Sequence, residues 1–259
     1  MNIVVCMKQV PNTNEIKIDP VTNTLKREGV PSIINPDDKA ALEAALTLKE
    51  QTRGTVTAVC MGPPQAEIAL REALAMGADR AVLATDRAFA GSDTLATSTI
   101  LAAVVKKVGF GLIIAGRQAI DGDTAQVGPQ LSEHLDLPLA TYVTDVKING
   151  DTARVKRQFE DRYQILDVKL PAVLTVLSTM NKPRYMSVNG IVDQQEKEVE
   201  YISVKDVEIN LDNIGLKGSP TKVKATFNKQ LNAAHELVEL EPQEAARIIV
   251  RALSEKHFI

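Results

Sequence analysis

Aromatic side chains make up only 3% of the 259-residue sequence, and tryptophan is absent. Proteins that bind single-stranded nucleic acid usually carry stacking aromatic rings, and nucleic-acid binders in general carry a basic stripe. The formal net charge is −3, the isoelectric point is near 5.7, and the lysines and arginines form no stripe along the chain. The composition therefore argues against nucleic acid as a partner.

Long apolar runs are also missing from the sequence. No stretch approaches the roughly 20 consecutive apolar residues that a transmembrane helix needs. The first ten residues, MNIVVCMKQV, lack the basic region and the small-residue cleavage site of a signal peptide, and they are typical of a short strand. We therefore expect a cytoplasmic protein with no membrane insertion.

Residues that bind metals or form covalent intermediates are scarce. Cys6 and Cys60 each lie inside an apolar strand pattern, far from any CxxC spacing, and we expect two buried thiols. The histidines at 134, 235 and 257 are scattered, and none has a second ligand nearby in the sequence. The sequence therefore predicts no metal site, and it contains no evident pair of nucleophile and base.

Strand and helix patterns alternate through the first half of the chain. Continuous apolar runs typical of strands buried on both faces cover residues 3–8, 55–62, 80–85 and 112–116. Helical patterns cover residues 36–51, 63–77 and 91–109, and a further one begins near Thr124 and runs to Leu135. This alternation predicts an α/β fold of the Rossmann-like, adenine-nucleotide-binding kind, with a mostly parallel sheet and helices on both faces.

The pattern changes after residue 138. Asn149-Gly150 between two alternating runs predicts a β-hairpin, and residues 163–170 and 171–178 predict two more strands. Residues 181–200 have the composition of a polar loop, and residues 241–259 have the pattern of an amphipathic helix. We expect an α/β domain over residues 1–195, then a C-terminal arm over 196–259 that straps its own domain or docks on another subunit.

Three loops follow the predicted parallel strands and lead into helices. They are SIINPDDKA (32–40), AGSDTLATS (90–98) and AGRQAIDGDTAQVGPQL (115–131). Open α/β sheets bind ligands at this edge, and the free N–H groups of a helix N-terminus attract phosphate. We expect the glycines at 91, 116 and 122 to let the backbone approach a ligand closely. Three such loops on one edge favour a nucleotide site.

The kind of nucleotide stays open at this point. The chain has neither GxGxxG after its first strand nor GxxxxGK[ST], so it lacks the dinucleotide fingerprint and the P-loop. Asp93, Thr94 and Thr124 can equally be plain helix caps. Asp121 and Asp123 cannot both lie against phosphate without a cation, so ribose hydroxyls, an adenine amino group or N–H groups of the loop are their expected partners.

Five segments together carry a resemblance to a known family. They are VVCMKQVPNT, INPDDKAALEAAL, AVCMGPPQAEIALREALAMGADRAVL, GRQAIDGDTAQVGPQLSEHLDLP and LPAVLTVLSTMNKPRYMSVNGI. In this order they resemble the beta subunit of electron transfer flavoproteins over residues 1–195, and more loosely beyond, with RQAIDGDTAQVGP and NKPRY as the most specific motifs. The resemblance implies a partner, a larger alpha subunit that carries its own FAD.

The beta subunits of this family bind an adenine nucleotide, which is AMP in some members and a second FAD in others. The cofactor-binding residues that the resemblance implies are Cys6, Asn35, Pro36, Asp37, Asp38, Met61, Ala115, Gly116, Arg117, Gln118, Ala119, Ile120, Asp121, Gly122, Asp123, Thr124, Ala125, Gln126 and Val127. The loop AGSDTLATS resembles the electron-bifurcating, anaerobic members and adds Asp93, Thr94 and Thr97. In those members the beta-subunit FAD takes a hydride from NADH. One electron goes to ferredoxin or flavodoxin, and the other goes through the alpha subunit to an acyl-CoA or related dehydrogenase.

In this interpretation the cofactor supplies the chemistry, so no catalytic residue is predicted, and NADH oxidation is expected only within the complex. Arg117 is expected either beside the flavin ring or in an ion pair at the sheet edge. The segment 181–198 corresponds to the family's recognition loop, which docks on the dehydrogenase; here Arg184, Tyr185, Val188 and Ile191 are the predicted partner-binding residues. The alternative for this segment is an exposed loop with no partner. The alternatives for the function of the whole protein are a non-bifurcating carrier with structural AMP and an adenine-nucleotide sensor of the universal-stress type.

Overall fold

The computed structural model describes residues 1–12, 31–224 and 239–259. The chain divides into two compact units, Met1–Lys224 and Ala225–Ile259. Every predicted site residue belongs to the first unit. The compact unit thus continues past residue 195, where we expected the α/β domain to end.

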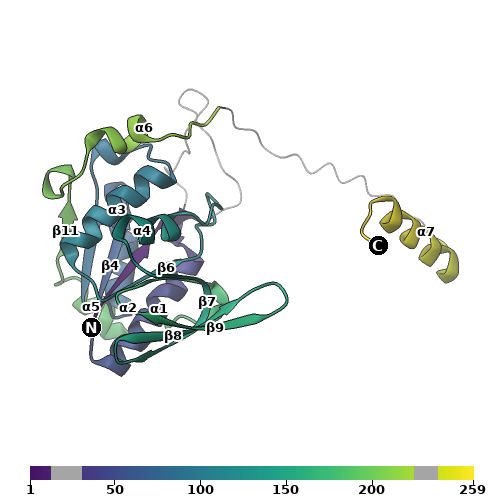
Figure 1. Cartoon of the computed structure of the whole chain (residues 1–259), viewed down its shortest axis with the longest axis horizontal. Coiled ribbons are helices and arrows are strands. Elements are labelled where there is room, and N and C mark those ends of the chain that lie inside the picture. The colour runs from purple at the N-terminus through teal and green to yellow at the C-terminus, as the bar shows by residue number, and fades with distance from the viewer. Residues whose placement is uncertain (13–30, 225–238) are drawn as a thin grey trace. The chain divides into compact units, whose positions relative to one another are not determined.

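The first unit is built on a large, mostly parallel sheet (Figure 1). Its strands are β1 (Asn2–Met7), β4 (Thr55–Met61), β5 (Arg80–Ala84), β6 (Leu112–Gly116), β7 (Leu139–Asn149), β8 (Thr152–Gln158), β9 (Tyr163–Lys169), β10 (Val173–Val176) and β11 (Val199–Ile202). Within the described residues the order is β11-β5-β4-β1-β6-β10-β7-β8-β9. Neighbours from β11 to β7 pair in parallel, whereas β7, β8 and β9 pair antiparallel. The predicted fold class is confirmed.

Helices cover both faces of this sheet. They are α1 (Pro36–Thr52), α2 (Glu67–Met76), α3 (Thr94–Val108) and α4 (Val127–Leu135). Alternate residues of β1 point to opposite faces: Ile3 and Val5 pack in the cluster that holds the leucines of α1 and α2, whereas Val4 packs with α3 and α4. Figure 1 shows the two helix pairs on opposite sides of the sheet. Because both faces are buried, the parallel strands consist of continuous apolar runs.

The strand order reverses at β1. From β1 the chain passes to β4 and β5 on one side, and α3 then carries it back to β6 on the other side of β1. The loops after β1 and β6 therefore diverge, and a crevice forms at the carboxyl ends of these two strands. Ligands of doubly wound folds bind at such a point, so the topology itself selects the ends of β1 and β6.

Several element boundaries differ from the predictions. The helix expected near Thr124 begins only at Val127, because Asp123 and Ala125 have left-handed φ angles of 50° and 54° that cannot continue an α-helix. The predicted helix 63–77 starts with a 3₁₀ turn before α2, and the predicted helix 91–109 is α3, which begins at Thr94.

The structure contains several elements that the sequence pattern did not predict. A short helix, α5 (Val188–Asp193), lies inside the segment expected to be a polar loop, and β11 follows it and pairs with β5. A small antiparallel sheet joins β2 (Gln9–Pro11) to β3 (Ser32–Ile34), and a short α6 spans Gly215–Gly218. The hairpin at Asn149-Gly150 is confirmed, with β7 and β8 on either side.

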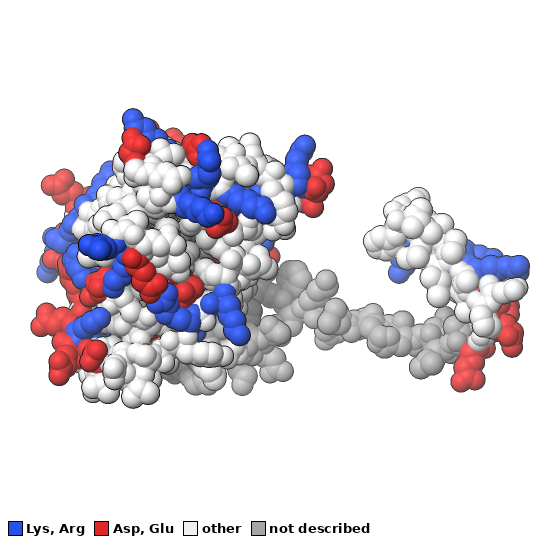
Figure 2. Space-filling view, turned by 90° about the horizontal axis from the view of Figure 1, so that it is seen from below, with Lys and Arg blue, Asp and Glu red and all other residues white. Residues whose placement is uncertain are grey.

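The C-terminal unit contains α7 (Pro242–Glu255), which confirms the predicted helix within residues 241–259. His235 lies outside the described residues. In the part of the chain that is described, no helix is long and apolar enough to cross a membrane, and no cluster of side chains is suited to hold a metal ion. On the face of the larger unit shown in Figure 2, positive and negative side chains are interspersed.

Candidate functional site

Asp38, in the first turn of α1, joins the two strands that border the crevice. Its Oδ2 accepts a hydrogen bond from the backbone N–H of Lys8 at 2.8 Å, and its Oδ1 accepts one from Gly116 N at 2.9 Å. Burial raises the pKa of this carboxyl to about 7, although the hydrogen bonds from Lys8 and Gly116 act in the opposite direction. The base of the crevice therefore contains an acid that titrates near neutral pH.

Glycine at position 116 is required by this same contact. A Cβ there would lie 2.4 Å from Asp38 Oδ1 and 2.7 Å from Asp37 Cβ. At Gly91 the neighbour is also the chain itself, since a Cβ would lie 3.1 Å from Leu216 Cβ. A Cβ added at Gly122 would meet no atom of the described residues within 4 Å, apart from its chain neighbours. The close approach at the first two glycines is thus to the protein rather than to a ligand.

Asn35 fixes the start of the loop that follows β6. This fully buried side chain donates from Nδ2 to the carbonyl of Gln118 at 2.8 Å and accepts from the N–H of Ile120 at 3.0 Å. A side chain that satisfies both a donor and an acceptor of another segment fixes that segment's path. Asn35, predicted from the first loop, is therefore brought together with Gln118 and Ile120, predicted from the third.

Lys8 is a site residue that the prediction missed. Its Nζ lies 2.6 Å from Asp121 Oδ1 and 2.8 Å from Asp121 Oδ2, and the Asp121 side chain is only 7% exposed. The ion pair closes the carboxyl end of β1 against the loop after β6. The position of Lys8, the first residue after a buried strand at the reversal of strand order, was the signal that could have identified it.

The loop at residues 117–126 also contacts the start of α3. Thr94 Oγ1 donates to Gln126 Oε1 at 2.8 Å, which joins the second and third predicted loops. Gln118 donates to Asp123 within the loop. Gly122, Asp123, Thr124 and Gln126 are exposed. The loop is thus fixed at both ends, and its middle faces outward.

The three helix N-termini at this edge differ in how well they suit an anion. The first turn of α1 carries Asp37 and Asp38, which repel negative charge. The first turn of α3 is capped by Asp93, which accepts from Ala96 N at 3.0 Å and from Thr221 N and Oγ1 at 3.0 and 2.8 Å. By contrast, α4 has no side-chain cap and no acidic residue in its first turn. The N-terminus of α4 is the best of the three for phosphate.

A cleft of about 790 Å³ opens at Arg117, where the loop at residues 117–126 begins. Asp37 and Arg117 line it on the crevice side, and Lys156 of β8 and Tyr163 of β9 line it on the hairpin side. Its volume lies in the range of small-molecule sites, about 300–1,000 Å³. The sequence did not predict the hairpin wall, because β8 and β9 reach this edge only through tertiary packing.

Two buried polar atoms border the cleft without a hydrogen-bond partner in the described structure, Asp37 Oδ2 and Arg117 Nε. They lie 3.5 Å apart and form an ion pair, while Asp37 Oδ1 accepts from Ser178 N at 2.9 Å. The pair corresponds to the second of the two expectations for Arg117. Because buried polar groups normally have partners, the two atoms are suited to meet polar groups of a ligand.

Four other residues considered in the sequence lie in β1, β4 and α3. Cys6 in β1 and Cys60 in β4 are buried as expected, and burial raises the pKa of each thiol to about 12. Both thiols therefore stay protonated at neutral pH. Met61 ends β4 and is half-buried, and Thr97 is half-buried one turn into α3.

The predicted partner-binding residues differ in their surroundings. Tyr185 is 90% exposed, Val188 is 79% exposed, and Ile191 is also exposed. Arg184 instead binds its own chain: its guanidinium contacts Glu43 with Nε–Oε2 at 2.9 Å and Glu50 with Nη1–Oε1 at 2.6 Å. The hydrogen bonds that Arg184 donates to these carboxylates raise its pKa above the ordinary value. Its role at a partner stays a prediction.

Comparison with known proteins identifies relatives of this chain. The electron transfer flavoprotein domain matches residues 22–207. The electron transfer flavoprotein subunit beta of Clostridium acetobutylicum is 55% identical over 259 residues, covering 100% of both chains. The caffeyl-CoA reductase-Etf complex subunit CarD of Acetobacterium woodii is 52% identical over 262 residues, again covering 100% of both. The acryloyl-CoA reductase electron transfer subunit gamma of Anaerotignum propionicum is 45% identical over 268 residues, with 100% of both covered.

These matches agree with the resemblance seen in the motifs RQAIDGDTAQVGP and NKPRY. They extend over the full chain, including the C-terminal unit. The chain belongs to the electron transfer flavoprotein family, as one of its beta subunits.

Proposed function

We propose that this beta subunit binds FAD in the crevice between β1 and β6 and works as the NADH-oxidising half of an electron-bifurcating complex. One observation carries the proposal: the cleft of about 790 Å³ opens at Arg117, the first residue of the loop at residues 117–126. An adenylate bound on that loop needs no such space, whereas the flavin half of a dinucleotide does. Asp37 Oδ2 and Arg117 Nε, which pair with each other at 3.5 Å but make no hydrogen bond, supply an acceptor and a donor at this position.

The residues present fit the cofactor in chemistry and placement. The uncapped N-terminus of α4, at Val127 and Gly128, offers backbone N–H groups for the pyrophosphate. The outward-facing part of the loop, with Thr124 and Gln126, offers polar groups for the ribose and adenine. Arg117 places a fixed positive charge at the cleft, where it favours an anionic ring. Because Asp93 is engaged by Thr221 and the Thr94 hydroxyl by Gln126, we expect Thr97 to be the ligand-facing side chain of the second loop.

The chemistry that bound FAD would supply is acceptance of a hydride from NADH and transfer of its two electrons one at a time, one to ferredoxin or flavodoxin and the other, through the alpha-subunit FAD, to a dehydrogenase. Two relatives carry names of CoA-ester reductase complexes, which supports an acyl-CoA or related dehydrogenase as partner here. The residues of this chain position the cofactor and set its electrostatic surroundings. None of them has to act as a nucleophile or a general base.

Two further surfaces complete the proposal. The exposed apolar residues Tyr185, Val188 and Ile191 dock on the dehydrogenase, and the C-terminal arm with α7 docks on the alpha subunit. Ile249 and Leu253 on α7 are exposed within the described chain, which supports a partner for this helix. The cytoplasmic location expected from the sequence stays a prediction.

A second candidate is a non-bifurcating carrier whose beta-subunit nucleotide is structural AMP. The ion pair between Arg117 and Asp37 favours it, because two charges that already neutralise each other need no flavin ring. Family membership gives no support to the universal-stress type of sensor.

The test is NADH-dependent reduction of ferredoxin by the heterodimer with its dehydrogenase. We expect ferredoxin reduction only while an enoyl-CoA acceptor is present, since the two electrons of each hydride must leave by separate routes. Ferredoxin reduction that needs no CoA ester, or none under any condition, contradicts the bifurcating function.

A further inference from the structure

The segment 181–198, which we call the recognition segment, presents large apolar side chains to solvent. Tyr185 and Val188 are almost fully exposed, and Val192 is more than half exposed. Exposed apolar patches of this kind mark interaction sites. A segment with so few buried side chains of its own needs outside contacts to keep one conformation.

The first end of the recognition segment is held on α1. The Arg184 guanidinium and its backbone N–H all bind the buried carboxylate of Glu43, with the backbone contact at 2.9 Å. Asn181 Nδ2 adds a hydrogen bond to Ala40 O at 3.0 Å. These contacts fix residues 181–184 against the middle of α1.

The second end is held by Arg71 of α2. Its Nη1 donates to two carbonyl oxygens of the segment, Gln194 O and Lys197 O, each at 2.7 Å. The other side of the guanidinium binds Glu67 Oε1 at 2.9 Å, and Glu67 in turn accepts from the Tyr201 hydroxyl on β11. Arg71 is therefore oriented by its own helix and by β11, and it directs one nitrogen at the segment.

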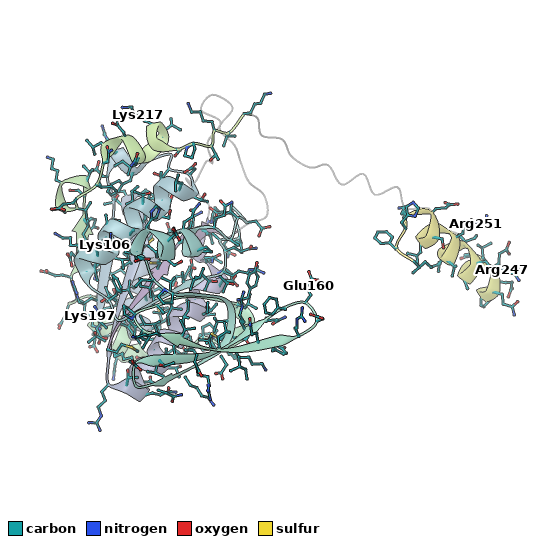
Figure 3. The ribbon with its side chains drawn as sticks, viewed as in Figure 1. Lys106, Glu160, Lys197, Lys217, Arg247 and Arg251 are labelled. Carbon is teal, nitrogen blue, oxygen red and sulfur yellow. The ribbon has the colours of Figure 1, made fainter. Side chains whose placement is uncertain are left out.

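Lys197 and α5 are held close to α2 by further contacts. Lys197 Nζ donates to Ala78 O at 2.9 Å, and Figure 3 labels this residue beside α5. Gly190 of α5 approaches α2 so closely that a Cβ would lie 2.2 Å from Ala75 O. The apolar side chains thus lie on a short helix whose position depends on α2.

We propose that Arg71 is a positioning residue for partner docking, which holds the recognition segment in its binding conformation before the dehydrogenase arrives. A segment ordered in advance loses less conformational entropy on binding, so its affinity is higher. The Arg71 guanidinium donates to Glu67 and to the segment's own carbonyls, so Arg71 acts through the segment rather than on the partner. The inference rests on the proposed docking of this segment on an acyl-CoA dehydrogenase.

The test compares heterodimers that carry Arg71→Ala, Arg71→Lys, Gly190→Ala or Arg80→Ala. Arg80 is the control, because its guanidinium forms an exposed ion pair with Glu200 of β11 rather than with the segment. The measurements are FAD content, kcat, the KM for the acyl-CoA dehydrogenase that the wild-type heterodimer reduces, and hydrogen exchange at residues 186–197.

We expect Arg71→Ala and Gly190→Ala to raise the KM about tenfold with kcat and FAD content unchanged, because only the ordering of the segment is affected. Hydrogen exchange at residues 186–197 should be faster in both variants. Arg71→Lys should recover part of the loss, since a lysine can reach one of the two carbonyls. Arg80→Ala should match the wild type.

Faster exchange in Arg71→Ala with an unchanged KM overturns the inference, and so does unchanged exchange. A wild-type heterodimer that reduces no dehydrogenase overturns the proposed docking function instead. The two failures are distinguishable, because hydrogen exchange reports on the segment without any partner.

Discussion

Lys8 and Asp121, which are 113 residues apart in the sequence, form an ion pair with Nζ–Oδ distances of 2.6 and 2.8 Å. Lys8 follows β1 and Asp121 lies in the loop after β6, so the pair closes the crevice at the reversal of strand order. Because the Asp121 side chain is almost fully buried while Lys8 is partly solvated, the carboxylate depends on the lysine for compensation of its charge.

Removal of this lysine should loosen the loop. We predict that Lys8→Ala lowers the free energy of unfolding by about 1–2 kcal/mol, because a buried carboxylate loses its partner but remains partly accessible to water. FAD retention should fall as well. Denaturant unfolding and flavin content measure the two effects. Lys217→Ala, which breaks an exposed ion pair with Asp212, should change neither.

The double variant Lys8→Ala/Asp121→Asn provides a further check on this prediction. It should recover part of the stability, since the remaining amide needs no counter-charge. Equal loss in the single and double variants would contradict the ion-pair explanation.

Asp38 gives the protein a specific pH dependence. In the folded protein its pKa is about 7, above the ordinary value of 3.8. Between pH 3.8 and pH 7 the folded state therefore binds a proton that the unfolded state does not. Stability contributed by this group is therefore fully present below pH 3.8 and is lost as the pH rises toward 7.

The variant Asp38→Asn isolates this effect. It should be less stable by about 1–3 kcal/mol, because an amide offers one acceptor where Lys8 N and Gly116 N need two. The difference in unfolding free energy between wild type and variant should shrink from pH 5 to pH 8. A difference that is constant over this range, measured by denaturant unfolding, would rule out titration of Asp38.

Gly116 at the end of β6 and Gly122 in the following loop should differ in their response to an added methyl group. Gly116→Ala places a Cβ 2.4 Å from Asp38 Oδ1, and we expect a loss of about 2 kcal/mol or more, since buried backbone and a bonded carboxylate must move. Gly122→Ala meets open space, so its stability should change by less than about 0.5 kcal/mol. Thermal unfolding distinguishes them, and equal effects would contradict the packing described at Gly116.

How much the sequence predicts depends on the range of the interactions. The strands and α1 to α3 follow from buried apolar runs and from caps such as Asp93, which are local signals. β11 has four residues, and its identity depends on pairing with β5, so no local pattern could distinguish it. The start of α4 was predicted too early because the left-handed φ of Ala125 has no signature in its residue type.

For the candidate site, the three loops could be predicted because parallel strands end at a common edge. The engagement of Arg184 by Glu43 could not, since it joins residues 141 positions apart through the packing of the recognition segment on α1. The hairpin wall of the cleft was missed for the same reason.

Arg117 allows a direct test of the cleft. We predict that Arg117→Ala weakens FAD retention about tenfold but leaves AMP binding unchanged, because the cleft lies beyond the adenylate part of the site. Equilibrium dialysis of the two nucleotides measures both affinities. Arg154→Ala, which removes an exposed pair with Asp167, is the control. An equal loss for FAD and AMP would place Arg117 at the adenylate instead.

The C-terminal helix should be essential for the heterodimer. Ile249 on α7 is 59% exposed, and we predict that Ile249→Asp prevents stable association with the alpha subunit, since it puts a charge where an apolar contact is proposed. Ser254→Asp adds the same charge on the polar face of α7 and should leave the complex intact. Gel filtration with light scattering measures the association; an intact complex with Ile249→Asp contradicts docking through this face.

The flavin and adenylate content of the purified heterodimer tests the central claim most directly. If the beta subunit binds FAD beside Arg117, the wild-type complex should contain two FAD per heterodimer, one from each subunit, and no AMP. One FAD together with one AMP would contradict the bifurcating function and leave a one-flavin electron carrier.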